Sequence, residues 1–187
     1  MIGRVLGIVG ALVGLVVVAA LVVFFAVAKH YRMPSSSMEP TFHCAKPAPG
    51  CEGSKDDHFI VFSFLSWGRG DIVAFHTPPS ALRACGAGGV FVKRVIGGPG
   101  DTVREDAHAF LWVNGRKLDE AYVRPFRRQQ DVEFRNHTWR VPQGDWFMVG
   151  DNRGESCDSR QWGPVRASAV IGRVFMTYWL LGRLSFR

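Results

Sequence analysis

Three segments of the sequence carry side chains whose types and spacing could do chemistry. The first, residues 33–41, reads Met-Pro-Ser-Ser-Ser-Met-Glu-Pro-Thr, so three adjacent serines stand between two prolines. Prolines stiffen the backbone and could hold one hydroxyl at the fixed angle that a nucleophile requires. An ordinary turn-forming loop is also rich in serine and proline, so this segment alone leaves both interpretations open.

The second segment, Val90–Ile96, places a lysine and an arginine side by side in an apolar run. Side chains alternate along a strand, so Lys93 and Arg94 point to opposite faces and one of them must face apolar neighbours. The common outcome is a long side chain whose charged end reaches solvent. A desolvated Lys93 would instead have a lowered pKa and could act as a general base, a role closed to arginine because it stays protonated.

The third segment, residues 150–160, interleaves two aspartates, two arginines and two serines. A charged stretch of this kind is usually a solvated surface loop. Alternatively, ion pairs between the carboxylates and the guanidinium groups could fix the loop, so that one hydroxyl orients a neighbouring amine.

Regular elements must position these segments, and the hydrophobic pattern predicts mainly short strands. Apolar runs rich in β-branched and aromatic residues predict strands at residues 58–62, 71–75, 90–96, 110–113, 146–149 and 170–181. Asn114-Gly115 predicts a hairpin turn, and residues 101–140 read as a small inserted β region. The sequence therefore predicts a mainly β, barrel-like domain over residues 29–100 and 141–187, with no long amphipathic helix after residue 28.

The N-terminal region is dominated by one apolar segment. The chain has 187 residues, of which 47% are hydrophobic and 21% charged, which excludes a disordered chain. Val5–Ala28 has no charged residue, and a helix of that length spans about 36 Å, enough to cross a hydrocarbon core of ~30 Å. We predict a membrane anchor over residues 5–28 after a short cytoplasmic segment, 1–4. A cleaved signal peptide ending at Ala26-Val27-Ala28 is the alternative, although its apolar region is usually only ~7–15 residues.

Charge points to a membrane surface rather than to nucleic acid. The formal net charge is +7, but the basic residues are scattered singly and in pairs, without the dense run typical of a nucleic-acid partner. A basic domain tethered beside anionic lipid headgroups accounts for this charge. The basic residues that flank the apolar segment are nearly balanced, so they do not fix its orientation.

The cysteines indicate an oxidising compartment. Their number is even, and all four follow the apolar segment. Cys44 and Cys51 enclose a short loop rich in proline and glycine, and they could close as a disulfide outside the cytoplasm. A zinc site with His43 beside Cys44 is the alternative, but the chain has no paired C-x-x-C spacing, so we predict no metal.

Taken in order, the chemistry-bearing segments resemble the signature boxes of the bacterial type I signal peptidases, membrane-bound Ser/Lys proteases that remove signal peptides from exported proteins. Pro34–Thr41 is similar to the P-S-x-S-M-x-P-T box, and Gly70–Val73 to the G-D-[IV]-V strand. Lys93–Asp101 resembles K-R-x-x-G-x-P-G-D, and Gly150–Gly163 resembles G-D-N-R followed by S-x-D-S-R-x-W-G. Four boxes in order are far more specific than any single motif.

The resemblance implies that Ser37 is the nucleophile and Lys93 its general base. It further implies that the Ser35 hydroxyl joins the Ser37 backbone N–H in an oxyanion hole, and that Ser156 hydrogen-bonds to and orients the Lys93 amine. Four charged residues would hold the last loop in place by ion pairs: Asp151, Arg153, Asp158 and Arg160.

The resemblance also implies a substrate, a fold and a location. Exported preproteins would bind as an extended strand and be cut after small residues at positions −1 and −3, without a cofactor. The fold would be a signal-peptidase-like β-barrel or sandwich with one N-terminal transmembrane helix, anchored as a single-pass protein with the catalytic domain extracytoplasmic, near the lipid surface and the export translocon. Apolar positions that match the boxes would line the substrate pockets: Met33, Pro34, Met38, Phe42, Phe91 and Val92.

Some features depart from the family pattern. The single anchor and the short segment between Lys93 and Asp151 suggest a Gram-positive or actinobacterial type, and Gly154-Glu155 stands where Asp-Asn is common. Cys157 lies beside Ser156, and we predict Cys85 as its partner. That bridge would tie the last box to the strand that carries Lys93.

Three other classes of protein compete with this interpretation. A Ser-His-Asp protease would use one of six histidines, but none lies in a motif-like context and there is no G-x-S-x-G elbow. A self-cleaving repressor or a pilin-maturing peptidase would share the Ser/Lys chemistry, and the former should carry a DNA-binding domain. A catalytically dead, tethered β domain that binds peptides should lack Ser37 or Lys93, and both are present.

Overall fold

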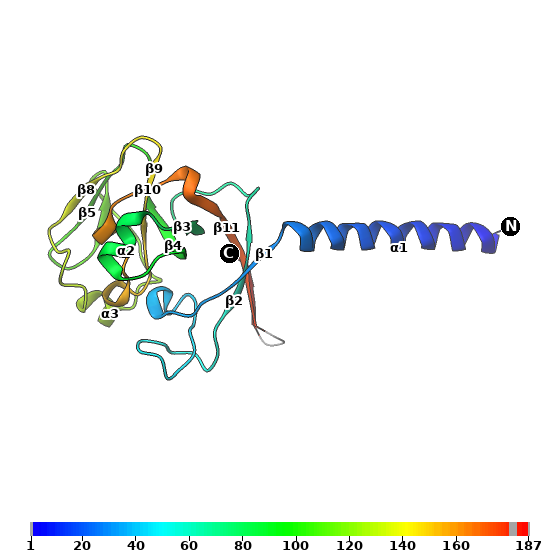
Figure 1. The fold of residues 1–187 in the computed structure, drawn as a ribbon, viewed down its shortest axis with the longest axis horizontal. Helices are drawn as coiled ribbons and strands as arrows, with labels where there is room; N and C mark the ends of the chain where they lie inside the picture. Colours follow the sequence, from blue (N-terminus) through cyan, green and yellow to red (C-terminus); the bar gives the residue numbers. More distant parts are fainter. Residues whose placement is uncertain (1, 180–182, 187) are drawn as a thin grey trace.

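The computed structural model describes residues 2–179 and 183–186 (Figure 1). A long helix, α1 (Ile2–Val27), extends away from the β domain. Within the described residues, no helix combines the length and apolarity that crossing a membrane requires. The anchor over residues 5–28 therefore stays a prediction.

The larger sheet has eight antiparallel strands and carries the residues of interest. Its order is β1-β2-β11-β3-β4-β9-β10, and β12 pairs with the far end of β11. The strands are β1 (Lys29–Arg32), β2 (His58–Phe62), β3 (Ile72–His76), β4 (Val90–Gly97), β9 (Asp145–Val149), β10 (Val165–Arg166), β11 (Val170–Trp179) and β12 (Arg183–Phe186). Because β4 lies between β3 and β9, Lys93 comes from the interior of the sheet.

The predicted strands of this sheet lie within one or two residues of the observed ones. β11 covers residues 170–179 of the run predicted over 170–181, and residues 180 and 181 lie outside the described part of the chain. The sequence analysis missed three short strands: β1 and β10, at the two ends of the strand order, and β12, which pairs with β11. β1 reads Lys-His-Tyr-Arg, and such a polar run lacks the apolar alternation from which a half-buried strand is predicted.

A second sheet, of four strands, lies at the end of the domain opposite α1 (Figure 1). Its order is β7-β6-β5-β8, with β5 (Thr102–Glu105), β6 (Leu111–Val113), β7 (Arg116–Lys117) and β8 (Thr138–Arg140). The Asn114-Gly115 turn between β6 and β7 is confirmed, with φ of 51° and 78°, the left-handed values that such a hairpin turn requires. All four strands fall within residues 101–140.

A shared core joins the two sheets. Ile96 of β4 and Phe147 of β9 pack with Val103 and Leu111 of the small sheet, and all four are at most 1% exposed. The burial of this apolar surface fixes the small sheet on the large one. The residues of the site therefore stand on a support built from both sheets.

Short helices complete the domain. They are η1 (Ser36–Met38), α2 (Pro79–Cys85), α3 (Pro125–Gln129), η2 (Arg153–Glu155), α4 (Ser159–Trp162) and η3 (Ala167–Ala169). The longest of these, α2, has 7 residues, so no long helix follows Val27 in the part of the chain that the structure describes. The polar segment 151–163 is not a solvated loop, since it contains η2 and α4 and most of its charged groups are buried.

Candidate active site

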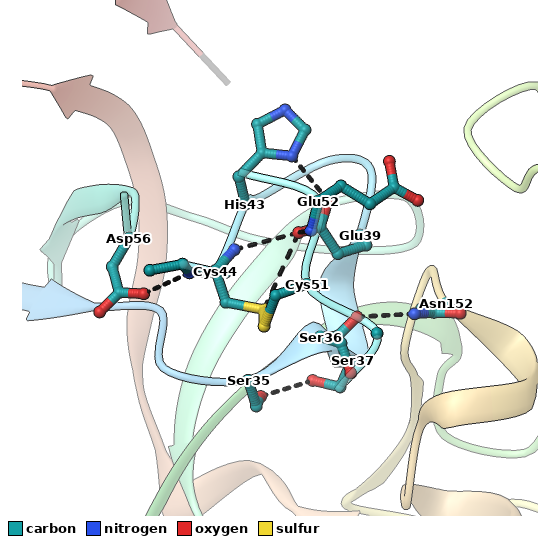
Figure 2. Close-up of a disulfide and its surroundings, with 12 residues drawn as sticks. Ser35, Ser36, Ser37, Glu39, His43, Cys44, Cys51, Glu52, Asp56 and Asn152 are labelled. Carbon is teal, nitrogen blue, oxygen red and sulfur yellow. Dashed lines mark hydrogen bonds and ion pairs between the residues drawn. A yellow bond between two sulfur atoms is a disulfide. The ribbon is translucent and has the colours of Figure 1, made fainter. Parts of the chain in front are cut away.

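Ser37 lies in the 3-10 turn η1, in the first of the three segments. Ser37 is 9% exposed, and its hydroxyl oxygen lies 3.3 Å from the hydroxyl oxygen of Ser35. Asn152 holds the turn from the other side, donating from its backbone N–H to the Ser37 carbonyl at 3.1 Å and from its side-chain amide to the Ser36 carbonyl at 2.9 Å (Figure 2). The first and third segments are therefore joined directly beside the serine.

Lys93 is buried in the interior of β4 and is 2% exposed. Burial disfavours its charged form and lowers the pKa of Lys93 from 10.5 to about 8, while the nearby carboxylates of Asp158 and Asp151 oppose this shift and Arg160 adds to it. Its amine lies 5.7 Å from the centre of the Phe91 ring. Of the two alternatives that the sequence left open, the structure therefore has the desolvated lysine, and about one in ten of its amines is neutral at pH 7.

One pocket of about 320 Å³ brings the first two segments together, because Ser35, Ser37 and Lys93 all line it. Four of the six predicted pocket residues are also in its wall: Met33, Pro34, Phe91 and Val92. The remainder of the lining was not predicted: Tyr31, Arg32, Phe59, Cys85, Ala87, Val90, Glu155 and Cys157. A larger cavity of about 630 Å³ lies in the inserted region and contains neither Ser37 nor Lys93.

Met38 and Phe42 were predicted as pocket residues, and this prediction is wrong. Both are fully buried in the core that also contains Phe59 and Val61, and neither is in the wall of the pocket. The reason is packing, because both side chains belong to this apolar core and neither reaches a surface that a substrate could contact.

Ser156 lies close to the nucleophile turn. Gly150 passes between them so closely that a Cβ at this position would lie 2.1 Å from the Ser156 hydroxyl oxygen and 2.5 Å from the Ser37 carbonyl oxygen. Among the described residues, the buried Ser156 hydroxyl has no hydrogen bond of standard geometry, although it lies near enough to help lower the pKa of Asp158. The predicted bond from Ser156 to the Lys93 amine is therefore not formed in this structure.

The third segment is fixed by ion pairs, and one of them, Asp158 with Arg160, lies within the segment itself. Asp158 caps α4 and accepts hydrogen bonds from the Arg160 guanidinium at 2.8 and 2.9 Å, and from the Gly150 N–H at 3.1 Å. Burial by itself would raise the pKa of Asp158, but the charge and hydrogen bonds of Arg160 outweigh it and hold that pKa below its usual value. Asp158 is therefore a carboxylate close to Lys93.

Other ion pairs of the third segment reach residues that the sequence analysis did not identify. Arg160 also pairs with Asp131 and, at 3.4 Å, with Glu105, while Arg153 pairs with Glu120. These three acids belong to the inserted region, and all are 6% exposed or less. The two arginines therefore attach the region of the small sheet to the third segment. The excess of charged residues in the third segment, which apolar runs flank, was a weak sequence signal for these pairs.

Asp151 pairs with the strand of Lys93. The Arg94 guanidinium donates to its two carboxylate oxygens at 2.9 and 2.6 Å, and Thr41 donates to it at 2.5 Å. Arg94 also lies over the ring of Tyr122, 3.9 Å from its centre. The two basic residues of β4 therefore differ. Arg94 forms an ion pair with Asp151, whereas Lys93 has no direct ion pair among the described residues.

Both expected disulfides are present. Cys44 is bonded to Cys51, and Cys85 to Cys157. Cys85 and Cys157 also line the pocket, so the second disulfide forms part of its wall. None of the residues that line this pocket is a histidine, which disfavours the Ser-His-Asp alternative.

Fold and site together define a class of protein, a mainly β hydrolase in which a serine and a buried lysine share one pocket. The family model described as "Signal peptidase, peptidase S26" matches residues 6–179. Signal peptidase I of Leptolyngbya laminosa is 35% identical over 92% of this chain and 79% of its own length. Probable signal peptidase I-2 of Synechocystis is 34% identical over 85% of this chain and 66% of its own length. The crystal structure of a signal peptidase I from Enterococcus faecalis V583 is 33% identical, covers 59% of this chain and 98% of its own, and has a TM-score of 0.48.

The chain therefore belongs to the signal peptidase family, peptidase S26. It is a hydrolase that acts on peptide bonds in the removal of signal peptides.

Proposed function

We propose that this protein cuts N-terminal signal peptides from exported preproteins after small residues at positions −3 and −1, with Ser37 as nucleophile and Lys93 as general base. The observation that carries the assignment of roles is the buried lysine, whose pKa is lowered to about 8, in the wall of the pocket that holds Ser37. A neutral amine is the base that a serine hydroxyl needs, and no other lysine lines this pocket.

The chemistry follows in two steps. The neutral Lys93 amine takes the hydroxyl proton of Ser37 while the Ser37 oxygen attacks the carbonyl carbon of the bond to be cut. The Lys93 ammonium then gives that proton to the departing amine. An ester of Ser37 with the signal peptide remains. Lys93 then removes a proton from water, the hydroxide attacks the ester, and the Ser37 oxygen recovers the proton.

Ser35 stabilises the oxyanion formed in both steps. Its hydroxyl lies 3.3 Å from the Ser37 hydroxyl oxygen. It is therefore close enough to donate to the carbonyl oxygen of the substrate carbon that Ser37 attacks. Together with the Ser37 backbone N–H it makes a two-donor oxyanion hole. In the proposed mechanism, Ser156 turns from its place near Asp158 to hydrogen-bond to the Lys93 amine and orient it.

The pocket suits small side chains on an extended peptide. Its volume of about 320 Å³ is shared by the reacting groups and by walls of Met33, Phe91 and Val92. A peptide that binds across the pocket in an extended conformation, as an added strand does, points alternate side chains into it. Alternate inward side chains match a requirement at positions −1 and −3.

We also propose the arrangement at the membrane. Residues 5–28 form the anchor, residues 1–4 lie in the cytoplasm, and residues 29–100 with 141–187 form the extracytoplasmic catalytic domain, into which 101–140 is inserted. The uncharged run and the two disulfides support a single-pass protein whose domain faces an oxidising compartment. The lipid surface and the export translocon are then its neighbours, and the short insertion fits the Gram-positive or actinobacterial single-anchor type.

The test is cleavage of a preprotein with an Ala-x-Ala site, in detergent and lipid, by the full chain and by Ser37→Ala and Lys93→Ala. We expect the wild type to cut after the second alanine, as read from the N-terminal sequence of the product, and both variants to be inactive. Activity retained by Lys93→Ala would place the base elsewhere, and binding without cleavage by the wild type would favour the tethered peptide-binding domain.

A further inference from the structure

The turn that carries Ser37 ends at a buried carboxylate to which the proposed function gives no role. Glu39 follows η1, and its backbone N–H donates to the Ser36 carbonyl at 3.0 Å, which closes the turn. Glu39 is only 1% exposed. A carboxylate is buried at a cost in solvation, so its hydrogen bonds need an explanation.

Those hydrogen bonds all reach one loop. Glu39 Oε1 accepts the backbone N–H of Cys44 at 3.1 Å and that of Glu52 at 2.9 Å, while Oε2 lies 2.6 Å from His43 Nδ1 (Figure 2). Cys44 begins the loop that the Cys44–Cys51 disulfide closes, and His43 and Glu52 flank that loop directly. One carboxylate oxygen thus ties both ends of this disulfide loop to the residue that ends the nucleophile turn.

The disulfide loop also contacts the turn itself. Gly50, at a φ of +74°, packs so closely on the turn that a Cβ there would lie 2.7 Å from the Ser36 hydroxyl oxygen. Arg127 donates to the Gly50 carbonyl at 3.4 Å and lies 3.5 Å from the carboxylate of Glu155, which lines the pocket. The loop therefore supports the turn and is connected to the wall of the pocket.

We propose that Glu39 is a positioning residue for Ser37 and acts by fixing the nucleophile turn to the disulfide loop. A 3-10 turn of three residues has little rigidity of its own, so its placement depends on what holds each side. Asn152 holds the Ser36 and Ser37 carbonyls, and Glu39 holds the end of the turn. The inference rests on the proposed role of Ser37 as nucleophile.

The experiment compares variants of the full chain in the preprotein assay. In Glu39→Ala we expect kcat to fall on the order of 10- to 100-fold, since a small displacement of a nucleophile costs that much, while KM stays within about twofold. Glu39→Gln should recover most of kcat, because its amide oxygen still accepts both backbone N–H groups. The matched control is Asp57→Ala, which removes a carboxylate that accepts the His43 backbone N–H at 2.8 Å just outside the disulfide loop, and it should retain the wild-type kcat.

Several results would overturn the proposal: an unchanged kcat in Glu39→Ala, an equal loss in Asp57→Ala, or no recovery in Glu39→Gln. If Glu39→Ala does not fold, Glu39→Gln and the double variant Cys44→Ser/Cys51→Ser replace it, and the double variant should lower kcat with KM kept. Wild type and Ser37→Ala are measured alongside. An inactive wild type or an active Ser37→Ala refutes the proposed function itself, whereas normal behaviour of both with an unchanged Glu39→Ala refutes only the role of Glu39.

Discussion

Replacing Lys93 by methionine should abolish cleavage and at the same time stabilise the fold. Methionine is close to lysine in length, fits the same buried space and carries no charge to desolvate. Burial lowers the pKa of Lys93 from 10.5 to about 8, and at about 1.4 kcal/mol per pH unit this difference means that the protonated amine destabilises the folded state by about 3 kcal/mol at pH 7. The variant should lose that penalty.

The gain in stability should depend on pH in a defined direction. Because the pKa of Lys93 is lower in the folded chain than in the unfolded one, the folded chain releases the proton first as the pH rises. Wild-type stability should therefore increase between about pH 8 and pH 10.5, and the advantage of Lys93→Met should shrink over the same range. At pH 7 the neutral fraction is about one in ten, roughly 300-fold more than an unperturbed lysine would have. Wild-type kcat/KM should therefore rise about tenfold per pH unit below pH 7, about fivefold from pH 7 to pH 8, and level off above that.

The assay is chemical denaturation of the full chain in detergent at several pH values, paired with cleavage measurements. The matched control is Lys46→Met, at an exposed lysine outside the pocket, which should change neither stability nor activity. A stability difference between Lys93→Met and wild type that is absent at pH 7, or constant from pH 7 to pH 10, would refute the argument that Lys93 is a desolvated base.

Three further predictions follow from the site. Ser35→Ala should lower kcat on the order of 100-fold with an unchanged fold, since it removes an oxyanion donor, and a wild-type kcat would exclude that role. Mass spectrometry of unreduced peptides should find Cys44–Cys51 and Cys85–Cys157, whereas free thiols would contradict both pairings and the extracytoplasmic location. Burial and the charge of Asp131 raise the pKa of Glu105 to about 7, so wild-type stability should fall as the pH rises from 4.5 through 7. Glu105→Gln should remove this dependence of stability on pH, which thermal unfolding of both proteins at pH 5 and pH 8 measures. The same loss of stability in both proteins between pH 5 and pH 8 would contradict the prediction.

The sequence was most informative where a short-range pattern has one physical meaning. Apolar runs rich in β-branched and aromatic residues predicted five of the eight strands of the large sheet, because strands buried on both faces have this composition, and Asn114-Gly115 predicted its turn from backbone conformation alone. Strand alternation showed only that one of Lys93 and Arg94 must face apolar neighbours, and it did not decide which one or whether the charged end reaches solvent. The structure shows that Lys93 is the one desolvated and that its pKa is lowered.

What the sequence could not reveal are contacts between distant segments. Nothing in the local pattern around Glu105, Glu120 or Asp131 distinguishes these acids from surface carboxylates, yet all three are buried partners of arginines in the third segment. The prediction that Met38 and Phe42 line the pocket was wrong for a related reason. A motif gives the order of residues along a turn, whereas the packing of the core decides which of them face the pocket.

These distant contacts bear on the chemistry at Lys93. Arg160 lowers the pKa of the lysine by its charge, and it also binds Asp158, whose charge acts in the opposite direction. Asp131 and Glu105 of the inserted region bind the same guanidinium. Without these two acids, Arg160 would be a buried cation with a single carboxylate partner, and the loop that places Asp158 beside Lys93 would lose its attachment. The region of the small sheet therefore acts on Lys93 indirectly, by holding in place charged groups that modify the pKa that burial has lowered.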